Sequence, residues 1–351
     1  MRGGTSKGLF ISADELPASE RLRDEMLLAA MGSPDLRQID GVGGAHPLTS
    51  KIAILAPPTR TDADVDYLFL QVSVDKAEVS GAQNCGNMLA GVGPWVVEQG
   101  WVEARDGETP VRIHMLNTGG MAIAKVPTEN GAVIYNGETQ ISGVPGTASA
   151  IPIEFLDIAG SSTGALFPTG SKMDVSQGIE VTCIDNGMPV ILIRAIDLAQ
   201  SGYETPQELE ADDALREVIE AIRLEMAPKM NLGDVRKKTV PKITLLAPAQ
   251  NGGLVMTRSF IPHRVHQAIG VLGAVSVATG CLIADTVGHE LTKNQESGPL
   301  GHRYAIEHPA GNFEVDLELD GDQVRRSALV RTARKLMVGD VFIPQTDWSG
   351  P

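Results

Sequence analysis

The order of the expected elements occurs twice along the chain, and this repeat limits the fold more than any other feature. In each pass a glycine-containing loop leads into a short apolar strand, and a second loop and strand follow. An apolar, glycine-dotted helix and a strand–turn–strand pair complete each pass. The first helix follows Asn84, and the second is expected over His266–Cys281. Because a helix without a polar face is buried, each half should wrap a curled sheet around its own central helix.

Three pairs of segments align the two passes: Gly160–Phe167 with Gly3–Phe10, Met188–Ile193 with the strand that begins after Ser50 and Lys51, and residues 306–315 with residues 113–122. The alignment predicts two similar α+β domains with mostly antiparallel sheets, over residues 1–146 and 147–345, joined at Gly143–Ala150. The cleft between two such domains is the default place for an active site.

The second domain should also contain a helical insertion near residues 204–230. Its start is well marked, because Thr205 can cap the helix, Pro206 suits the first helical position and Glu208 completes a capping box. The insertion is acidic.

Charge and cysteine spacing exclude several classes of protein. The net charge of −15 disfavours nucleic acid and acidic membrane surfaces as partners, and an anionic substrate would need a local cationic pocket. Cys85, Cys183 and Cys281 are widely separated, which argues against a zinc site and a disulfide framework and favours a reducing cytoplasm. We expect no signal peptide or membrane span, and a homodimer is compatible with these features. Phosphate-binding, dinucleotide-binding and serine-hydrolase motifs are absent from the sequence.

The stretch Gln83–Gly93 is typical of a helix start that carries a thiol. Asn84 is the expected N-cap, and Cys85 should lie in the first turn, where the helix dipole and free N–H groups favour negative charge. Such a position suits a reactive thiol or a bound carboxylate. A packed, inert cysteine is the alternative, and the stretch alone does not decide between them.

Five motifs together resemble the PrpF-like isomerases: Met1–Gly8, Leu48–Lys51, Asn84–Asn87, Asn186–Val190 and Ser259–His266. The resemblance covers the whole chain and implies the diaminopimelate-epimerase-like fold, in agreement with the internal repeat. It implies proton transfer without a metal or organic cofactor, on small unsaturated di- and tricarboxylates, in bacterial breakdown of aromatic acids. It also implies a short segment ahead of Arg2 that would form most of a first strand.

Lys51 is the predicted base and Cys85 its predicted assistant. Lys51 stands at a loop-to-strand edge and is followed by four apolar residues, a setting in which desolvation disfavours the ammonium form. Cys85 would return the proton or position the substrate. A surface lysine and a packed cysteine are the alternatives. The region Gln267–Gly270 has no thiol, which disfavours a symmetric two-thiol mechanism.

Donors for substrate carboxylates are expected at the two helix starts and in the motifs: Arg2, Thr5, Ser6, Thr49, Ser50, Asn84, Gly86, Asn87, Met188, Arg264 and His266. Backbone N–H groups at the first helix start would bind one carboxylate, and an arginine would bind another through two hydrogen bonds. An exposed arginine or a capping histidine is the alternative for Arg264 and His266.

The chemistry leaves several functions open. A keto–enol tautomerisation and a 1,3-allylic double-bond shift need the same base and the same enolate-like intermediate. The substrate could be any unsaturated carboxylate of the family, with 2-methylaconitate, aconitate and methylitaconate among the alternatives. A non-catalytic carboxylate-binding protein of the same fold is the alternative from another class.

Overall fold

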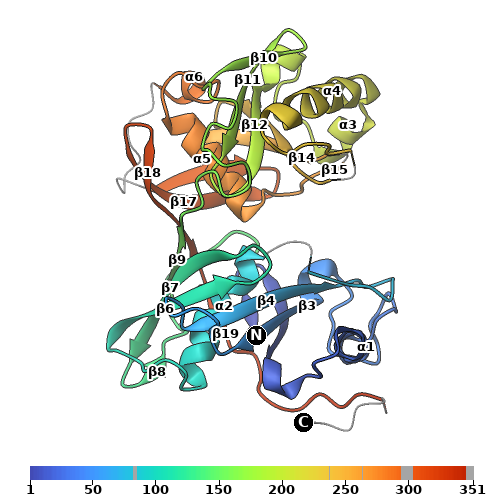
Figure 1. The fold of residues 1–351 in the computed structure, drawn as a ribbon, viewed down its shortest axis with the longest axis vertical. Helices are drawn as coiled ribbons and strands as arrows, with labels where there is room; N and C mark the ends of the chain where they lie inside the picture. The colour runs from blue at the N-terminus through green and yellow to red at the C-terminus, as the bar shows by residue number, and fades with distance from the viewer. Residues whose placement is uncertain (82–84, 237, 263, 294–302, 345–351) are drawn as a thin grey trace. The chain divides into compact units, whose positions relative to one another are not determined.

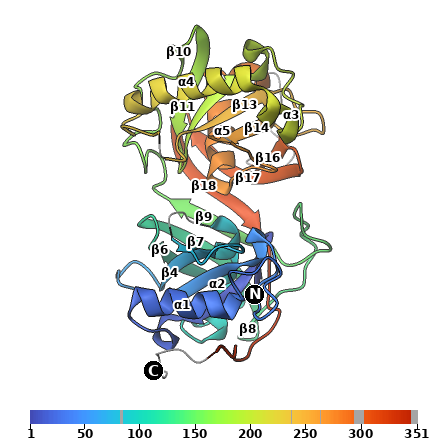
Figure 2. The ribbon, with the colours of Figure 1, turned by 90° about the vertical axis from the view of Figure 1, so that its right-hand side faces the viewer.

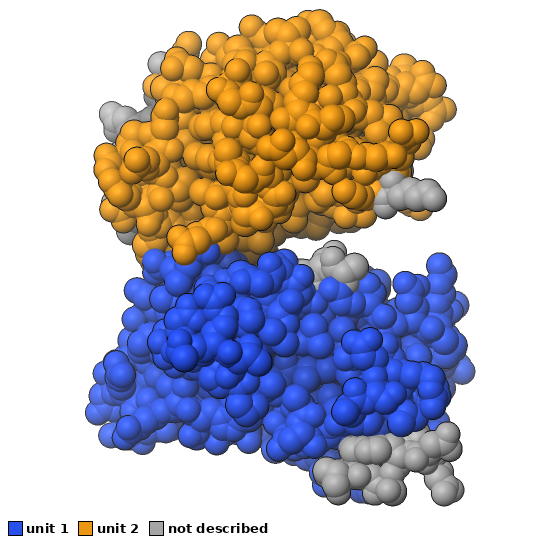
Figure 3. Space-filling model, in the orientation of Figure 1, with its two compact units in different colours: residues 1–156, 330–351 blue, residues 157–329 orange. Residues whose placement is uncertain are grey.

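The computed structural model divides the chain into two compact units, residues 1–156 with 330–351 and residues 157–329 (Figure 3). It describes all residues except 82–84, 237, 263, 294–302 and 345–351. The predicted boundaries differ from this division, because residues 147–156 and 330–345 belong with unit 1. Strand pairing explains the difference: residues 151–156 pair with a strand of unit 1, and the returning chain places Ala333 and Arg334 beside Gly3 and Arg2.

The elements of unit 1 are β1 (Arg2–Gly3), β2 (Ser6–Ser12), η1 (Ala13–Glu15), α1 (Glu20–Met31), η2 (Pro47–Thr49), β3 (Lys51–Ala56), β4 (Val65–Val72), β5 (Val79–Ser80), α2 (Gly86–Glu98), β6 (Gly107–Met115), β7 (Gly120–Glu129), β8 (Ala132–Val133), β9 (Ile151–Leu156) and β19 (Ala333–Arg334). β2 pairs parallel with β3, and β4 pairs parallel with β6. The pairs β3–β4, β6–β7 and β7–β9 are antiparallel. Figures 1 and 2 show α2 among these strands and α1 on the outside of unit 1.

The elements of unit 2 are β10 (Asp174–Ser176), β11 (Ile179–Asp185), β12 (Pro189–Arg194), η3 (Ala195–Leu198), α3 (Pro206–Ala211), α4 (Asp213–Lys229), β13 (Lys242–Ala247), β14 (Val255–Ile261), β15 (Arg264–Val265), α5 (Val271–Leu282), α6 (His289–Thr292), β16 (Arg303–His308), β17 (Gly311–Asp320) and β18 (Gln323–Arg331), whose last two residues belong to unit 1. The pairing order of unit 1 recurs: β12–β13 and β14–β16 are parallel, whereas β13–β14, β16–β17 and β17–β18 are antiparallel. The predicted α+β repeat, a curled sheet around a central helix, is therefore confirmed.

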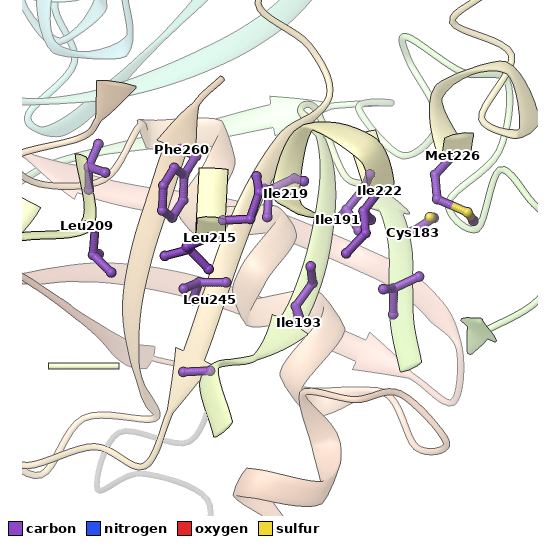
Figure 4. Packing of buried hydrophobic residues seen from close by; sticks show 14 of the residues in the cluster. Cys183, Ile191, Ile193, Leu209, Leu215, Ile219, Ile222, Met226, Leu245 and Phe260 are labelled. Atoms are coloured by element: carbon purple, nitrogen blue, oxygen red, sulfur yellow. The ribbon is translucent and has the colours of Figure 1, made fainter. Parts of the chain in front are cut away.

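Each sheet packs on two helices, one central and one outer. In unit 1, Ile52 and Ile54 of β3 join Leu27 and Met31 of α1 in one apolar cluster. In unit 2, Figure 4 shows Ile219, Ile222 and Met226 of α4 packed with strand residues including Ile191 and Leu245. Burial of each such side chain contributes about 1.5–3 kcal/mol. Because side chains alternate along a strand, the residues between these positions face the central helix.

The central helices α2 and α5 are apolar over most of their surface, and the side chains of Met88, Leu89, Val275 and Val277 are fully buried. The predicted insertion in the second domain is also helical, and Thr205 and Glu208 form the predicted capping box. In the described parts of the chain, no helix combines the length and the apolar character needed to span a bilayer.

The structure corrects the predicted alignment of the two halves. Met188–Ile193 was matched with the strand of Lys51, but β12 corresponds to β2, because each is the parallel neighbour of the strand that follows. The counterpart of β3 is β13. The predicted match of Gly160–Phe167 with the first strand is also wrong, because residues 160–167 form turns and bends.

Both central helices begin later than predicted. α5 begins at Val271, because the chain remains sheet-like through His266, whose N–H donates to the Ser259 carbonyl at 2.8 Å. Gly270, in an extended conformation, is its N-cap. α2 begins at Gly86, so Cys85 is the N-cap and does not lie in the first turn. The predicted N-cap, Asn84, lies outside the described residues.

Candidate active site

One face of β4 connects the two candidate catalytic residues of unit 1. Tyr67, Phe69 and Gln71 alternate along this strand, so their side chains share a face. Gln71 is the cross-strand partner of Lys51, whose Nζ donates to the Gln71 Oε1 at 2.5 Å. The same Nζ lies 5.0 Å from the ring centroid of Phe69. Since Lys51 is only 6% exposed, its amine is held at a defined position inside the unit.

The amide of Gln71 has a fixed orientation. Its Nε2 donates to the carbonyl oxygens of Pro47 and Ser50, both at 3.0 Å, and of Val72 at 3.2 Å. The amide oxygen must therefore be the atom that accepts from Lys51. The hydroxyl groups just before Lys51 form hydrogen bonds within the loop. The Thr49 hydroxyl donates to the His46 carbonyl, and the buried Ser50 hydroxyl lies within hydrogen-bonding distance of the Gln38 Oε1 and the His46 carbonyl. These two predicted substrate-binding residues thus stabilise the loop that presents Lys51.

Cys85 lies at the other end of the same β4 face. The hydroxyl of Tyr67 donates to the carbonyl oxygen of Cys85 at 3.4 Å. Burial raises the pKa of Tyr67 well above its ordinary value, so the phenol remains a neutral donor. Because Cys85 is the N-cap, the N–H groups of Gly86 and Asn87 begin the first turn beside it. Lys51 and the carbonyl of Cys85 therefore contact side chains at the two ends of one β4 face, and Gly86 and Asn87 follow Cys85 at the helix start.

The glycines of the first motif permit close packing around this face. Gly4 has a φ of +51°, and a Cβ there would lie 2.2 Å from the Asn87 Oδ1. The turn after it is held by Asn87, whose Nδ2 donates to the Thr5 Oγ1 at 3.0 Å. A Cβ on Gly8 would lie 2.1 Å from the carbonyl oxygen of Lys51. The motif thus seats β1 and β2 directly against the start of α2 and against Lys51.

Ser6 is a candidate donor to a ligand. Its side chain is 1% exposed, and its hydroxyl has no hydrogen-bond partner among the described residues. An unsatisfied buried hydroxyl costs about 1–3 kcal/mol. On β2, Ser6 shares a face with Gly8 and with Phe10, whose ring lies against Gly91 of α2. The hydroxyl is therefore on the side of the strand that faces the central helix.

Arg2 lies in a separate cavity of unit 1. Its Nη1 lies 2.8 Å from the carbonyl oxygen of Gly4, and 3.0 and 2.9 Å from the carbonyl and hydroxyl oxygens of Thr332. Arg334 is its cross-strand neighbour, and both arginines line a cavity of about 220 Å³. Burial, together with the charge of Arg334, lowers the pKa of Arg2. No acidic side chain lines this cavity in the described part of the chain, so it favours an anion.

Three predicted binding residues belong to unit 2. The Met188 carbonyl accepts a hydrogen bond from the Ser276 hydroxyl at 2.7 Å. Arg264 is exposed and forms a 3.2 Å ion pair with Glu210. The half-buried His266 accepts a hydrogen bond on Nδ1 from the N–H of Ala268 at 2.9 Å.

Two cysteines are part of the cores, as the sequence predicts. Cys183 and Cys281 are fully buried. Burial raises the pKa of both thiols, that of Cys281 to about 12, so neither is a reactive thiolate at neutral pH.

The chain matches the family described as "PrpF protein" over residues 1–344. It belongs to the PrpF family. It is 57% identical over 351 residues to the 4-oxalomesaconate tautomerase of Pseudomonas putida, covering 100% of this chain and 97% of that protein. It is 54% identical over 344 residues to the (4E)-oxalomesaconate Delta-isomerase of a Novosphingobium species, covering 98% of this chain and 96% of the other.

A crystal structure of methylitaconate-delta-isomerase superposes with a TM-score of 0.86 at 35% identity, over 100% of this chain and 97% of that one. The predicted family and fold are therefore confirmed. The PrpF-family chain is an isomerase, as predicted.

Sequence reasoning missed the residues that hold the two candidate catalytic groups. Tyr67, Phe69 and Gln71 alternate along β4, and this alternation is the sequence signal that puts all three on one face. Asn117 gave no local signal. It holds Phe69 through both backbone groups, at 2.8 and 2.9 Å, and also donates to the Gly81 carbonyl at 2.9 Å.

Proposed function

We propose that this PrpF-family isomerase acts on 4-oxalomesaconate, with Lys51 as the base and Cys85 assisting, in the bacterial breakdown of aromatic acids such as gallate and protocatechuate. The two relatives named for 4-oxalomesaconate share 57% and 54% of their residues with this chain. The 3-methylitaconate isomerase of Eubacterium barkeri shares 35%. The identities therefore favour 4-oxalomesaconate over the other unsaturated carboxylates.

In the proposed reaction Lys51, as the neutral amine, takes a proton from a carbon next to the conjugated system. The C–H electron pair moves into that system and forms a dienolate, and Lys51 becomes an ammonium. The Gln71 Oε1 and the face of Phe69 are placed to stabilise this cation. A proton returned to a different atom, from the thiol of Cys85 or from Lys51, completes either a tautomerisation or an allylic shift without net gain or loss of protons.

Substrate carboxylates would be held by donors of unit 1. The N–H groups of Gly86 and Asn87 start a helix of 13 residues, whose dipole favours an anion. The hydroxyl of Ser6 is unsatisfied among the described residues and is available to a carboxylate oxygen. These groups support a small anionic tricarboxylate as the substrate.

One observation carries the proposal: the amine of Lys51 is buried, held by Gln71 and Phe69, on the same β4 face that contacts Cys85 through Tyr67. A surface lysine would need none of these contacts. The test is to incubate the protein with 4-oxalomesaconate in heavy water and to follow each proton position by NMR. Parallel assays with 2-methylaconitate, aconitate and methylitaconate measure the preference within the family.

Lys51→Met should abolish turnover and deuterium exchange, since it keeps the length of the side chain and removes the base. Lys76→Met, at an exposed lysine of unit 1, is the matched control and should behave as wild type. Near wild-type turnover in Lys51→Met would reject the mechanism. Cys85→Ser should lower the rate or remove exchange at one carbon, and unchanged rate and exchange would make Cys85 structural.

A further inference from the structure

Unit 2 carries a lysine at the position that Lys51 occupies in unit 1. Residues 51–57 read Lys-Ile-Ala-Ile-Leu-Ala-Pro, and residues 242–248 read Lys-Ile-Thr-Leu-Leu-Ala-Pro. Each lysine opens a strand that pairs parallel with the strand before it, Lys51 opposite Gly8 and Lys242 opposite Val190. The two lysines therefore correspond in their local sequence, in the strand that they begin and in the parallel pairing of that strand.

Both lysines also lie on the same face of their sheets. The residue after each lysine is an isoleucine that packs in the outer cluster of its unit, Ile52 with α1 and Ile243 with α4. Because side chains alternate, Lys51 and Lys242 lie on the opposite face, which is the face of the central helix.

The neighbours of the two lysines differ. Lys51 is held by Gln71 and lies against Phe69, two residues apart on the next strand. On β14 the corresponding residues, counted from the pair Thr244–Ser259, are Ile261 and Ser259. The Ser259 hydroxyl hydrogen-bonds that of Thr244 at 2.9 Å. Unit 2 thus has a hydroxyl pair where unit 1 has an aromatic ring, and Ile261 where unit 1 has the amide that accepts from the lysine.

The loop that leads to Lys242 is held by Arg223 of α4. Arg223 is completely buried and is paired with Glu220 through two contacts of 2.7 Å. Its Nη1 also lies 3.2 Å from the carbonyl of Val240, in the loop that leads to Lys242. Burial and the charge of Arg223 lower the pKa of Lys242 to about 8. Among the described residues, the ammonium of Lys242 makes no hydrogen bond or ion pair.

His266 adds a second donor. The N–H of His266 donates to the Ser259 carbonyl at 2.8 Å, and Ser259 is the cross-strand partner of Thr244, which is two residues from Lys242. Burial and the charge of Lys242 lower the pKa of His266, so the imidazole is neutral at physiological pH. Because its Nδ1 accepts from the Ala268 N–H, its Nε2 carries the proton in the neutral ring. Lys242 is partly buried and has no acidic partner among the described residues, so an anion bound by its ammonium and by the His266 N–H would offset its desolvation.

We propose that Lys242 and His266 form a carboxylate-binding subsite in unit 2, at the place in the repeat that Lys51 occupies in unit 1. Its ligand is a carboxylate group of a small polycarboxylate. Two sources carry this group: the substrate, in which case the subsite rests on the proposed function, and a free polycarboxylate that acts as an effector. Both units have a lysine at this position of the repeat, but the neighbouring strand carries Gln71 and Phe69 in unit 1 and Ile261 and Ser259 in unit 2.

The test uses the full chain and citrate as the probe, because citrate carries three carboxylates and has no alkene to isomerise. Binding is measured by isothermal titration calorimetry at pH 7 for wild type, Lys242→Met, Lys242→Arg and Lys229→Met. Lys229 is the matched control, an exposed lysine of the same unit paired with Glu225 at 3.0 Å. Lys242→Met should weaken citrate at least tenfold, as expected for loss of one charge-assisted hydrogen bond. Lys242→Arg should retain most of the affinity, and Lys229→Met all of it.

Kinetics with 4-oxalomesaconate then separate the two sources. A rise in KM of at least tenfold in Lys242→Met, with or without a fall in kcat, identifies the substrate as the ligand. An unchanged KM with lost citrate binding identifies an effector. Equal citrate affinity in wild type and Lys242→Met, or no saturable citrate binding to wild type, overturns the subsite. Absence of turnover by wild type rejects the proposed function but leaves the citrate comparison valid.

Discussion

Replacement of Lys242 by methionine should make unit 2 more stable at neutral pH. The lysine loses hydration on folding and gains no partner among the described residues, whereas methionine has a similar length and no charge. The fall of its pKa from 10.5 to about 8 corresponds to about 3 kcal/mol, at about 1.36 kcal/mol for each pH unit. Because part of the side chain reaches solvent, we expect the variant to gain about 1–3 kcal/mol in free energy of unfolding at pH 7.

The gain should depend on pH in a defined direction. Folded Lys242 binds its proton only below about pH 8, whereas the unfolded chain holds it up to about 10.5. Between these values the unfolded state binds more protons, so the stability of wild type rises with pH. The advantage of Lys242→Met is therefore complete below pH 8 and disappears as the pH approaches 10.5. His266, with its lowered pKa, stays neutral in this window.

The assay is urea unfolding at pH 7, 8, 9 and 10 in chloride buffer without polycarboxylates, since a bound anion would conceal the effect. Two compact units need not unfold together, so pulsed hydrogen exchange of peptides that cover β13 should accompany circular dichroism. Lys229→Met is the control and should follow wild type. A Lys242→Met variant that is less stable at pH 7, or whose difference from wild type is constant from pH 7 to 10, would refute the reasoning.

Three further predictions concern unit 1 and the reaction. Gln71→Leu should lower kcat by roughly 10- to 100-fold, because Lys51 loses the acceptor that positions it, whereas Gln71→Glu keeps an oxygen there and should retain more activity; equal rates in wild type and Gln71→Leu would contradict this role. Gly8→Ala should lower the melting temperature by roughly 2–10 °C and reduce turnover, because its Cβ would lie 2.1 Å from the Lys51 carbonyl; a variant with wild-type stability would show that β2 can move. Treatment with EDTA followed by dialysis should leave the rate unchanged, and a loss restored by added metal would reject the prediction of cofactor independence.

Much of the fold could be predicted because its signals are local. The capping box at Thr205 and the apolar character of the central helices follow from a few neighbouring residues. Two of the three segment pairs that aligned the halves were wrong, whereas residues 306–315 do correspond to residues 113–122, since Ile306 and Ile113 pair in the same way with the parallel strand beside them. The shared Lys-Ile-x-x-Leu-Ala-Pro segments would have aligned β3 with β13 directly.

The candidate site depended more on long-range pairing. Lys51 and Cys85 were chosen from motifs, but the register that sets Gln71 against Lys51 depends on how β3 and β4 pair. The sequence alone also does not show whether a serine beside a motif lysine contacts a ligand or its own loop. In the structure, Ser50 contacts its loop. Ser6 is also a serine, but its hydroxyl has no hydrogen-bond partner among the described residues. Only the packed structure distinguishes these cases.

The duplicated architecture gives a physical reason for assigning different tasks to the two units. Each unit presents a lysine at the start of the same strand, and each has a central helix. Unit 1 adds Gln71, Phe69 and a cysteine at the helix start, which suit a base and a proton donor. Unit 2 has Ser259 and Ile261 on the neighbouring strand and Gly270 as the N-cap. At these positions its lysine therefore has neither the amide acceptor nor the thiol that accompany the predicted base in unit 1. A charged lysine with no partner among the described residues is suited to binding an anion. The proposed division of tasks, with proton transfer in unit 1 and carboxylate binding in unit 2, rests on this difference: the thiol of Cys85 and the amide of Gln71 are in unit 1, and the corresponding positions of unit 2 are Gly270 and Ile261.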